Sequence, residues 1–217
     1  MKLETQPLQV VDLGRMAYRD AWARQREAHE TVLAGGSPML FIVEHPPVIT
    51  FGRRGVVPQH LRASTPQLQQ MGVDVVESDR GGDVTFHGPG QLVAYPILRL
   101  NDHRYSVGAY VHALEQHVID TLQQFGISAY TDREAVGVWT NREDRPEKIC
   151  AIGVRVKRGV TMHGIALNVE TNLAYFDLIV PCGISARGVT SVKKVLGDTC
   201  PTVETVRAAL AAQLSTL

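Results

Sequence analysis

Apolar residues are spaced in two ways along this chain, and the spacing predicts both helices and strands. Helical spacing predicts helices over residues 14–33, 65–71, 106–125 and from 202 onward. Continuous or alternating apolar runs predict strands over residues 39–43, 48–51, 73–77, 92–98, 136–139, 148–157 and 161–169. Strands and helices are mixed throughout, and no long linker divides the chain. The pattern therefore predicts one α/β (α+β) domain over residues 1–217, with a core from about residue 30 and a mixed sheet flanked by helices.

Turn and cap residues refine the predicted elements. Ser106 and Thr202 precede two of the predicted helices and are expected to be their N-caps. Residues 158–160 contain Gly159 and are expected to join two strands as a hairpin. The polar stretch at residues 140–147 is expected to be a loop.

Charge and composition exclude several classes of protein. The chain has 217 residues, with 22 Lys and Arg against 22 Asp and Glu, so its net charge argues against a protein that mainly binds nucleic acid. The first residues contain no apolar segment typical of a secretory signal, and no apolar run is long enough to span a bilayer. Three cysteines without a CxxC pair suggest neither a disulfide framework nor a zinc site. A reducing, cytoplasmic location without membrane association is expected.

Cys182 lies between a proline and a glycine. Pro181 restricts the backbone and Gly183 permits close approach, so this turn is expected to expose backbone beside the sulfur. An isolated cysteine is often a buried structural residue, and a reactive thiol is the alternative.

Lys148 begins a strand with strict alternation. Alternation places it on the same face as Cys150 and the apolar residues that follow, opposite Gly153 and Arg155. A lysine at the end of an apolar face is either a desolvated base with a lowered pKa or an edge residue that extends its ammonium to water.

The next strand also carries candidate pocket residues. Alternation places His163 with Ile165 and Leu167, and Gly164 with Ala166 and Asn168. His163 is either a hydrogen-bonded core histidine or a polar group in a pocket wall. The small residues leave room for a slim ligand against the sheet.

Arg80-Gly81-Gly82 is a second glycine-rich turn. Successive backbone N–H groups in such a turn can hold an anion or an oxyanion, although a tight structural turn is the simpler interpretation. The turn lacks the P-loop lysine and the GxGxxG spacing, so it does not indicate a nucleotide site.

Four motifs together are far more specific than any one of them. They are RGGDVTFHGPGQ at residues 80–91, KICAIGVR at 148–155, HGIALN at 163–168, and PCGI at 181–184 followed by VTS at 189–191. In this order, from about Phe41 to Ser191, the chain resembles the lipoyl(octanoyl) transferases. One position departs from the family pattern, since Cys150 stands where a small residue such as alanine is expected.

The resemblance implies a fold like the catalytic domain of biotin and lipoate protein ligases. It also implies transfer of an octanoyl group from octanoyl-acyl carrier protein to a lysine of a lipoyl-accepting domain, through a cysteine thioester and without a metal or cofactor. The implied acceptors are the lipoyl domains of 2-oxoacid dehydrogenase acyltransferase subunits and the glycine cleavage H protein.

By motif match the implied catalytic pair is Cys182 and Lys148. The implied substrate-binding residues are Arg80, Gly81, Gly82, Asp83, Val84, Thr85, Phe86, His87, Ala151, Ile152, Gly153, Gly164, Ile165 and Ala166, with His163 and Asn168 in support. A nearby ammonium favours the thiolate form of a cysteine, so the pair is chemically suited to nucleophilic catalysis.

Acyl carrier proteins are generally acidic, so a basic docking surface is expected on the enzyme. The candidates are Arg155, Lys157, Arg158, Lys193 and Lys194. Scattered solvated charge is the alternative.

Three other functions remain open at this point. An ATP-dependent lipoate or biotin ligase would form an adenylate and would not need the Cys182–Lys148 pair. An amidotransferase would take its acyl group from an acylated protein. A non-catalytic binding module would tolerate the loss of Cys182. A papain-like protease fits poorly because its sequence signature is absent.

Overall fold

The computed structural model describes residues 7–53, 60–142, 145–180 and 187–217. Within these residues the main sheet has the spatial order β1 (Gln9–Arg15), β2 (Met39–Glu44), β6 (Gln91–Ile97), β10 (Val160–Asn168), β9 (Arg145–Lys157), β8 (Val138–Arg142) and β7 (Tyr130–Thr131). The short strand β11 (Gly188–Val189) also pairs with β9. The β1–β2 and β9–β11 pairs are parallel and the others are antiparallel, so the sheet is mixed, as predicted.

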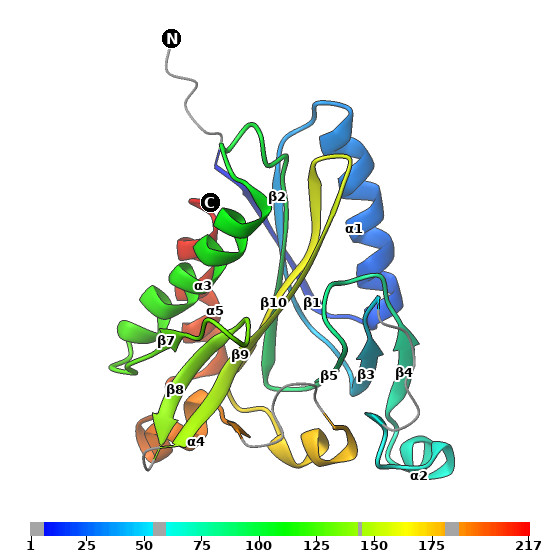
Figure 1. Cartoon of the computed structure of the whole chain (residues 1–217), viewed down its shortest axis with the longest axis vertical. Helices are drawn as coiled ribbons and strands as arrows, with labels where there is room; N and C mark the ends of the chain where they lie inside the picture. The colour runs from blue at the N-terminus through cyan, green and yellow to red at the C-terminus, as the bar shows by residue number, and fades with distance from the viewer. Residues whose placement is uncertain (1–6, 54–59, 143–144, 181–186) are drawn as a thin grey trace.

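Helices cover both faces of this sheet (Figure 1). Helix α1 (Tyr18–Leu33) packs on β6 and β10, where its residues Ala21, Ala28 and Val32 join Phe41 and Met162 in one apolar cluster. Helices α3 (Val107–Gln123) and α5 (Val203–Leu214) lie on the opposite face and enclose the larger cluster. The sheet is therefore buried on both sides, which explains why all nine residues of β10 are buried.

A second, three-stranded sheet lies beside the main one. Its order is β4 (Asp74–Glu77), β3 (Val48–Phe51) and β5 (Val84–His87). Short helical segments complete the described fold: α2 (Thr65–Gln70), α4 (Val192–Leu196) and 3₁₀ turns at Leu173–Leu178 and Gly197–Thr199. The turn at Arg80 and Gly81, which leads into β5, packs on Gly153 and Val154 of β9, so the small sheet is held against the main one there.

Local sequence signals account for most element boundaries. The side chains of Ser106 and Thr202 accept hydrogen bonds from the backbone N–H groups three residues later, which confirms both predicted N-caps. Ser64, rather than Thr65, caps α2 through a capping box. The β9–β10 turn has positive φ at Arg158 and Gly159, as a two-residue hairpin turn requires.

Two stretches differ most from the sequence prediction, and the short elements β7, β11 and α4 were not predicted. Residues 9–15 form edge strand β1, and α1 begins only at Tyr18, whereas a helix was predicted from residue 14. Most of the predicted loop at 140–147 is strand, because β8 continues to Arg142 and β9 begins at Arg145. Here the pairing of β8 with β9 satisfies the backbone hydrogen-bonding groups, while exposed side chains such as Asn141 remain in water. A polar stretch can therefore form a β-strand. Among the described residues, no helix has the length and apolar character needed to cross a membrane.

Candidate active site

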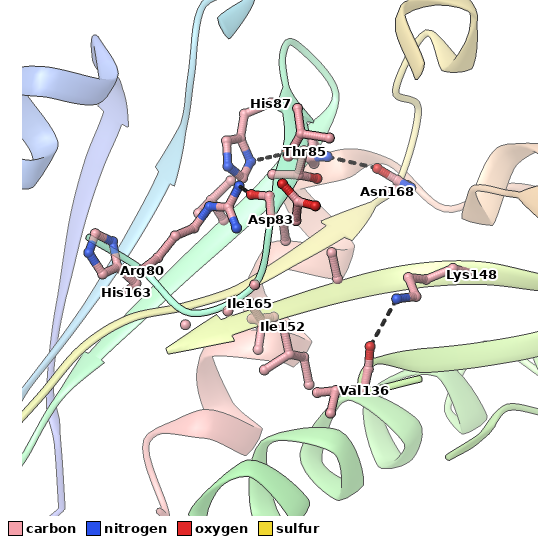
Figure 2. A pocket seen from close by; sticks show the side chains of 18 of the residues that line it. Arg80, Asp83, Thr85, His87, Val136, Lys148, Ile152, His163, Ile165 and Asn168 are labelled. Carbon is pink, nitrogen blue, oxygen red and sulfur yellow. Dashed lines mark hydrogen bonds between the residues drawn. The ribbon is translucent and has the colours of Figure 1, made fainter. Parts of the chain in front are cut away.

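A pocket of about 370 Å³ lies where β9 and β10 face the turn at residues 80–85. Figure 2 shows Lys148 on one side of this pocket and His163 on the other, with Ile152 and Ile165 between them. The lining residues are Tyr18, Arg80, Gly82, Asp83, Val84, Thr85, His87, Gln91, Val93, Tyr95, Glu134, Ala135, Val136, Lys148, Ala151, Ile152, Gly153, His163, Gly164, Ile165, Ala166, Asn168, Phe176 and Val189.

Small residues in register form one wall of the pocket. Ala151 pairs with Ala166 and Gly153 with Gly164 across the β9–β10 ladder. A Cβ on Gly153 would lie 2.9 Å from the carbonyl oxygen of Gly81, so the turn approaches the strand too closely for any larger residue. This close contact holds the turn against the sheet.

Arg80 fastens the same turn from inside. It is only 7% exposed, and its guanidinium donates to the backbone oxygen of Thr50 at 2.7 Å and to that of Asp83 at 2.6 Å. It also donates to the hydroxyl of Thr50 at 3.0–3.1 Å and to the carbonyl of Gly81 at 3.0 Å. These bonds join β3 to the turn. The guanidinium thus donates to acceptors within the protein and stabilises the pocket wall.

A chain of amide hydrogen bonds connects the pocket to the segment after Cys182. His87 Nδ1 donates to Gln91 Oε1 at 2.8 Å, and Gln91 Nε2 donates to Asn168 Oδ1 at 2.9 Å. Asn168 Nδ2 in turn donates to the backbone oxygen of Thr190 at 3.0 Å. Burial lowers the pKa of His87 well below its usual value, so the imidazole is neutral and its Nε2 is an acceptor.

His163 lies on the α1 side of the sheet, which corrects the prediction that it shares a face with Ile165 and Leu167. Its φ of 58° interrupts the regular alternation of the strand. The ring lies beside Tyr18, Trp22 and Tyr95, and its Nε2 is 2.7 Å from Asp79 Oδ1. His163 is thus both a hydrogen-bonded buried histidine and a polar group in the pocket wall, so both interpretations drawn from the sequence apply.

Lys148 also lies on a different face from the one predicted. Trp139 pairs with Lys148 but Val138 pairs with Cys150, so the register shift at Ile149 places Lys148 and Cys150 on opposite faces. Lys148 lines the pocket, where its Nζ donates to the backbone oxygen of Val136 at 2.9 Å. Burial is the main cause that lowers the pKa of this lysine.

Cys150 is part of the hydrophobic core. It is fully buried in the cluster beneath α3 and α5, and burial raises the pKa of its thiol to about 12. Since the thiolate is the reactive form, Cys150 is unsuited to act as a nucleophile despite its closeness to Lys148 in sequence.

Cys182 lies outside the described residues, but the chain on both sides of it reaches the pocket. Phe176 precedes it and Val189 follows it, and both side chains line the pocket. Val189 pairs with Lys148 in the β11–β9 ladder, and Thr190 N–H donates to the carbonyl of Lys148 at 3.0 Å.

The structure brings together nearly all residues predicted for the site within its described part. Gly81 and Phe86 do not line the pocket, because Gly81 packs its backbone on Val154 and Phe86 stacks on Tyr175. The prediction did not include the lining residues Tyr18, Gln91, Val93, Tyr95, Glu134, Ala135, Val136, Phe176 and Val189. Gln91 stands within the first motif, and its amide beside His87 was a usable signal. Val189 stands in the motif at residues 189–191. The remaining residues belong to no motif and lie on α1, on β6, in the loop at residues 134–136 and in the 3₁₀ turn at Leu173–Leu178.

Most of the predicted basic surface is already paired. Arg155 forms an ion pair with Asp79 beside the pocket. Lys193 and Lys194 contact Glu170 and Glu147 at 3.6 and 2.8 Å.

Comparison with known proteins identifies the family. Residues 17–215 match the lipoyl protein ligase A/B catalytic domain family. An octanoyltransferase of Chloroflexus aggregans is 47% identical over 199 residues, which cover 91% of this chain and 89% of the relative. An octanoyltransferase of Salinispora tropica is 44% identical over 215 residues, covering 94% of this chain and 96% of the relative. The chain belongs to the octanoyltransferase family. Membership of this family makes the chain an acyltransferase and confirms the resemblance seen in the motifs.

Solved structures of ligases share the octanoyltransferase fold. A putative lipoate protein ligase from Thermoplasma acidophilum with bound lipoic acid has a TM-score of 0.72 and 17% identity, covering 96% of this chain and 85% of that one. A lipoate-protein ligase A bound with ATP also has a TM-score of 0.72 and 17% identity, covering 98% and 85%. These likenesses confirm the predicted ligase-like fold class.

Proposed function

We propose that this octanoyltransferase takes an octanoyl group from octanoyl-acyl carrier protein and passes it to one lysine of a lipoyl-accepting domain, through a thioester on Cys182. The acceptors would be the lipoyl domains of 2-oxoacid dehydrogenase acyltransferase subunits and the glycine cleavage H protein. The structural neighbours include a bipartite lipoate protein ligase of an archaeal lipoylation system with its E2 lipoyl domain, which supports this class of acceptor.

The observation that carries the proposal is the setting of Lys148. It lines the pocket beside Val136, and its described hydrogen-bond partner is a backbone carbonyl rather than a carboxylate. Its strand pairs with β11, the first strand after the segment that contains Cys182. A desolvated lysine beside a thiol can stabilise the thiolate while charged and accept a proton when neutral.

In the first half of the proposed reaction, the Cys182 thiolate attacks the thioester carbonyl of the carrier. The carbon–sulfur bond to the carrier's thiol breaks, and the Lys148 ammonium protonates the departing sulfur. In the second half, the acceptor amine attacks the enzyme thioester and neutral Lys148 takes its proton. The Cys182 thiolate then leaves, and the pair is restored without an external energy source.

The pocket supports an acyl substrate of slim shape. With the reacting carbonyl beside Lys148, the chain would run along the small residues of β9 and β10 toward His163 (Figure 2). Ile152 and Ile165 would contact its methylene groups, which is the apolar lining that such a chain requires.

The experiment is intact-protein mass spectrometry after mixing the enzyme with octanoyl-acyl carrier protein in the absence of ATP. We expect an octanoyl-sized mass gain in wild type and in Cys150→Ala, and none in Cys182→Ala. Loss of the gain only in Cys150→Ala would refute the assigned nucleophile.

The same assay separates the rival functions. No mass gain in any variant, but acceptor modification once ATP and free octanoate are supplied, would establish a ligase instead. Acylation from an octanoylated protein but not from the carrier would establish an amidotransferase. Full function of Cys182→Ala would support a non-catalytic binding module, which does not need this thiol.

A further inference from the structure

The loop at residues 132–137, here named the capping loop, covers Lys148 at the edge of the pocket. Val136 supplies the carbonyl that accepts from Lys148 Nζ at 2.9 Å. Trp139 Nε1 donates to the carbonyl of Ala135 at 2.8 Å, and Gly137 N–H donates to Glu115 Oε1 at 3.1 Å. The position of the Lys148 ammonium therefore depends on how this loop is held.

Arg187 ties the capping loop to the chain that follows Cys182. Its Nη1 lies 2.6 Å from Asp132 Oδ2, and its Nη2 lies 3.5 Å from Glu134 Oε2. Both Arg187 and Asp132 are half-buried, at 24% and 20% side-chain exposure. Arg187 comes directly before β11, which pairs with the strand of Lys148.

Arg187 and Lys148 share one aromatic ring. The guanidinium carbon of Arg187 lies 5.2 Å from the centre of the Trp139 ring, and Lys148 Nζ lies 4.7 Å from it. Trp139 is fully buried, so two cations are held beside one indole next to the pocket.

The carboxylates near Lys148 are engaged elsewhere. Asp132 Oδ1 accepts from the N–H groups of Glu134 and Ala135, and its Oδ2 pairs with Arg187. Glu115 binds Gly137 N–H and lies 3.6 Å from His112. Among the described residues, no carboxylate forms an ion pair with Lys148.

We propose that Arg187 is a positioning residue that occupies the Asp132 carboxylate, so that Lys148 remains paired with a carbonyl and can lose its proton during acyl transfer. This inference rests on the proposed function, because it assigns Arg187 a role in the same site.

The electrostatics agree with this geometry. The titratable groups whose charges act on Lys148 are Arg187 and Asp132 from the loops, Glu115 from α3 and Cys150 on its own strand. Burial is the largest cause that lowers the pKa of Lys148. The charge of Arg187 also lowers it, whereas Cys150, Asp132 and Glu115 raise it. Replacing Arg187 with a neutral residue removes that charge and frees Asp132 to pair with the ammonium. Both changes favour protonated Lys148.

The test measures the pKa of Lys148 directly, by competitive acetylation of lysines across a pH series with peptide mass spectrometry. In Arg187→Gln we expect the labelling midpoint of Lys148 to rise by about one pH unit. The double variant R187Q/D132N should return toward the wild-type midpoint, and Arg187→Lys should stay close to it. Arg207→Gln is a matched control. Arg207 lies on α5, away from the pocket, is 18% exposed and pairs with Asp12 of β1 at 2.7 Å.

A second readout is the pH profile of aminolysis of the preformed octanoyl-enzyme by a lipoyl domain. The ascending limb should move with the Lys148 midpoint, and the rate in Arg187→Gln should recover at high pH. An equal loss of rate at every pH, with an unchanged labelling midpoint, would refute the proposal and indicate a purely structural role. If the Lys148 labelling midpoint shifts in Arg187→Gln but the enzyme never forms an acyl-enzyme, the effect of Arg187 on Lys148 stands. The proposed function is then refuted instead.

Discussion

Trp139 and Lys148 lie opposite each other on neighbouring antiparallel strands, and the Lys148 ammonium is 4.7 Å from the centre of the indole ring. This pairing exists because the β8–β9 register shifts between Val138 and Trp139. The shift turns Lys148 toward the pocket and leaves Cys150 in the core. One local irregularity therefore separates the two residues that a regular strand would have placed on one face.

Lys148→Arg should separate the two halves of the proposed reaction. Arginine keeps the positive charge but does not lose its proton near neutral pH. We expect the octanoyl-enzyme still to form, more slowly because arginine cannot protonate the departing sulfur, while aminolysis by the acceptor falls by about 10²–10⁴-fold, the usual contribution of a general base. Intact mass would show a persistent acyl-enzyme. Lys157→Arg, an exposed lysine at the end of the same strand, should behave as wild type. Rapid aminolysis in Lys148→Arg would rule out proton abstraction by this lysine.

Cys150 should be inert in the folded protein. Its thiol is fully buried with a raised pKa of about 12, so we expect no alkylation by iodoacetamide until the protein unfolds. Cys150→Ala should keep its transferase activity and lose about 1 kcal/mol of unfolding free energy through a small cavity. Peptide mapping after alkylation and urea unfolding provide the two measurements. Prompt native-state labelling of Cys150 would contradict the burial described above.

Stability should fall as the pH drops below about 6.5, because buried histidines resist protonation in the folded state. Burial lowers the pKa of His45 from 6.5 to about 4, while its Nδ1 donates to Met16 O and its Nε2 accepts from Tyr95. A lowered folded-state pKa means that the unfolded chain binds the proton first, so this stability is complete above pH 6.5 and is lost toward pH 4. For His45 alone the loss at pH 5 is about 2 kcal/mol.

Urea unfolding at pH 7.5 and pH 5.0 checks this dependence. His45→Gln should be less stable at both values but should lose less stability between them. His112→Gln is the control for loss of a surface imidazole, since His112 is 68% exposed. A His45→Gln protein with the same pH dependence as wild type would show that His45 is not one of the responsible groups.

Gly164→Ala should be strongly destabilising although alanine is the smallest possible replacement. The added Cβ would lie 2.2 Å from the carbonyl oxygen of Ala94 and 2.9 Å from Pro96 Cδ. Relief requires movement of strand backbone, so we expect a loss of about 3 kcal/mol or more. Gly108→Ala in α3 meets open space and should be neutral or stabilising by up to about 1 kcal/mol. Similar melting temperatures for the two variants would contradict the close β6–β10 contact.

Local signals were sufficient wherever a feature depends on neighbours in the chain. The apolar run at residues 39–43 predicted β2, Ser106 and Thr202 predicted their N-caps, and Gly159 predicted the β9–β10 turn. Local signals were insufficient for β1. This half-polar edge strand forms because it pairs with β2, which is distant in sequence.

The sequence by itself determined the fold class, the family and most members of the candidate site, because ordered motifs and apolar periodicity are properties of the linear chain. The tertiary structure decided which way the key side chains point. The register shift beside Lys148 and the positive φ of His163 each reverse a face that strict alternation predicts. Packing between strands and loops distant in sequence sets such irregularities, as it also sets the inward use of Arg80 and the contact between Arg187 and Trp139. No local pattern encodes them.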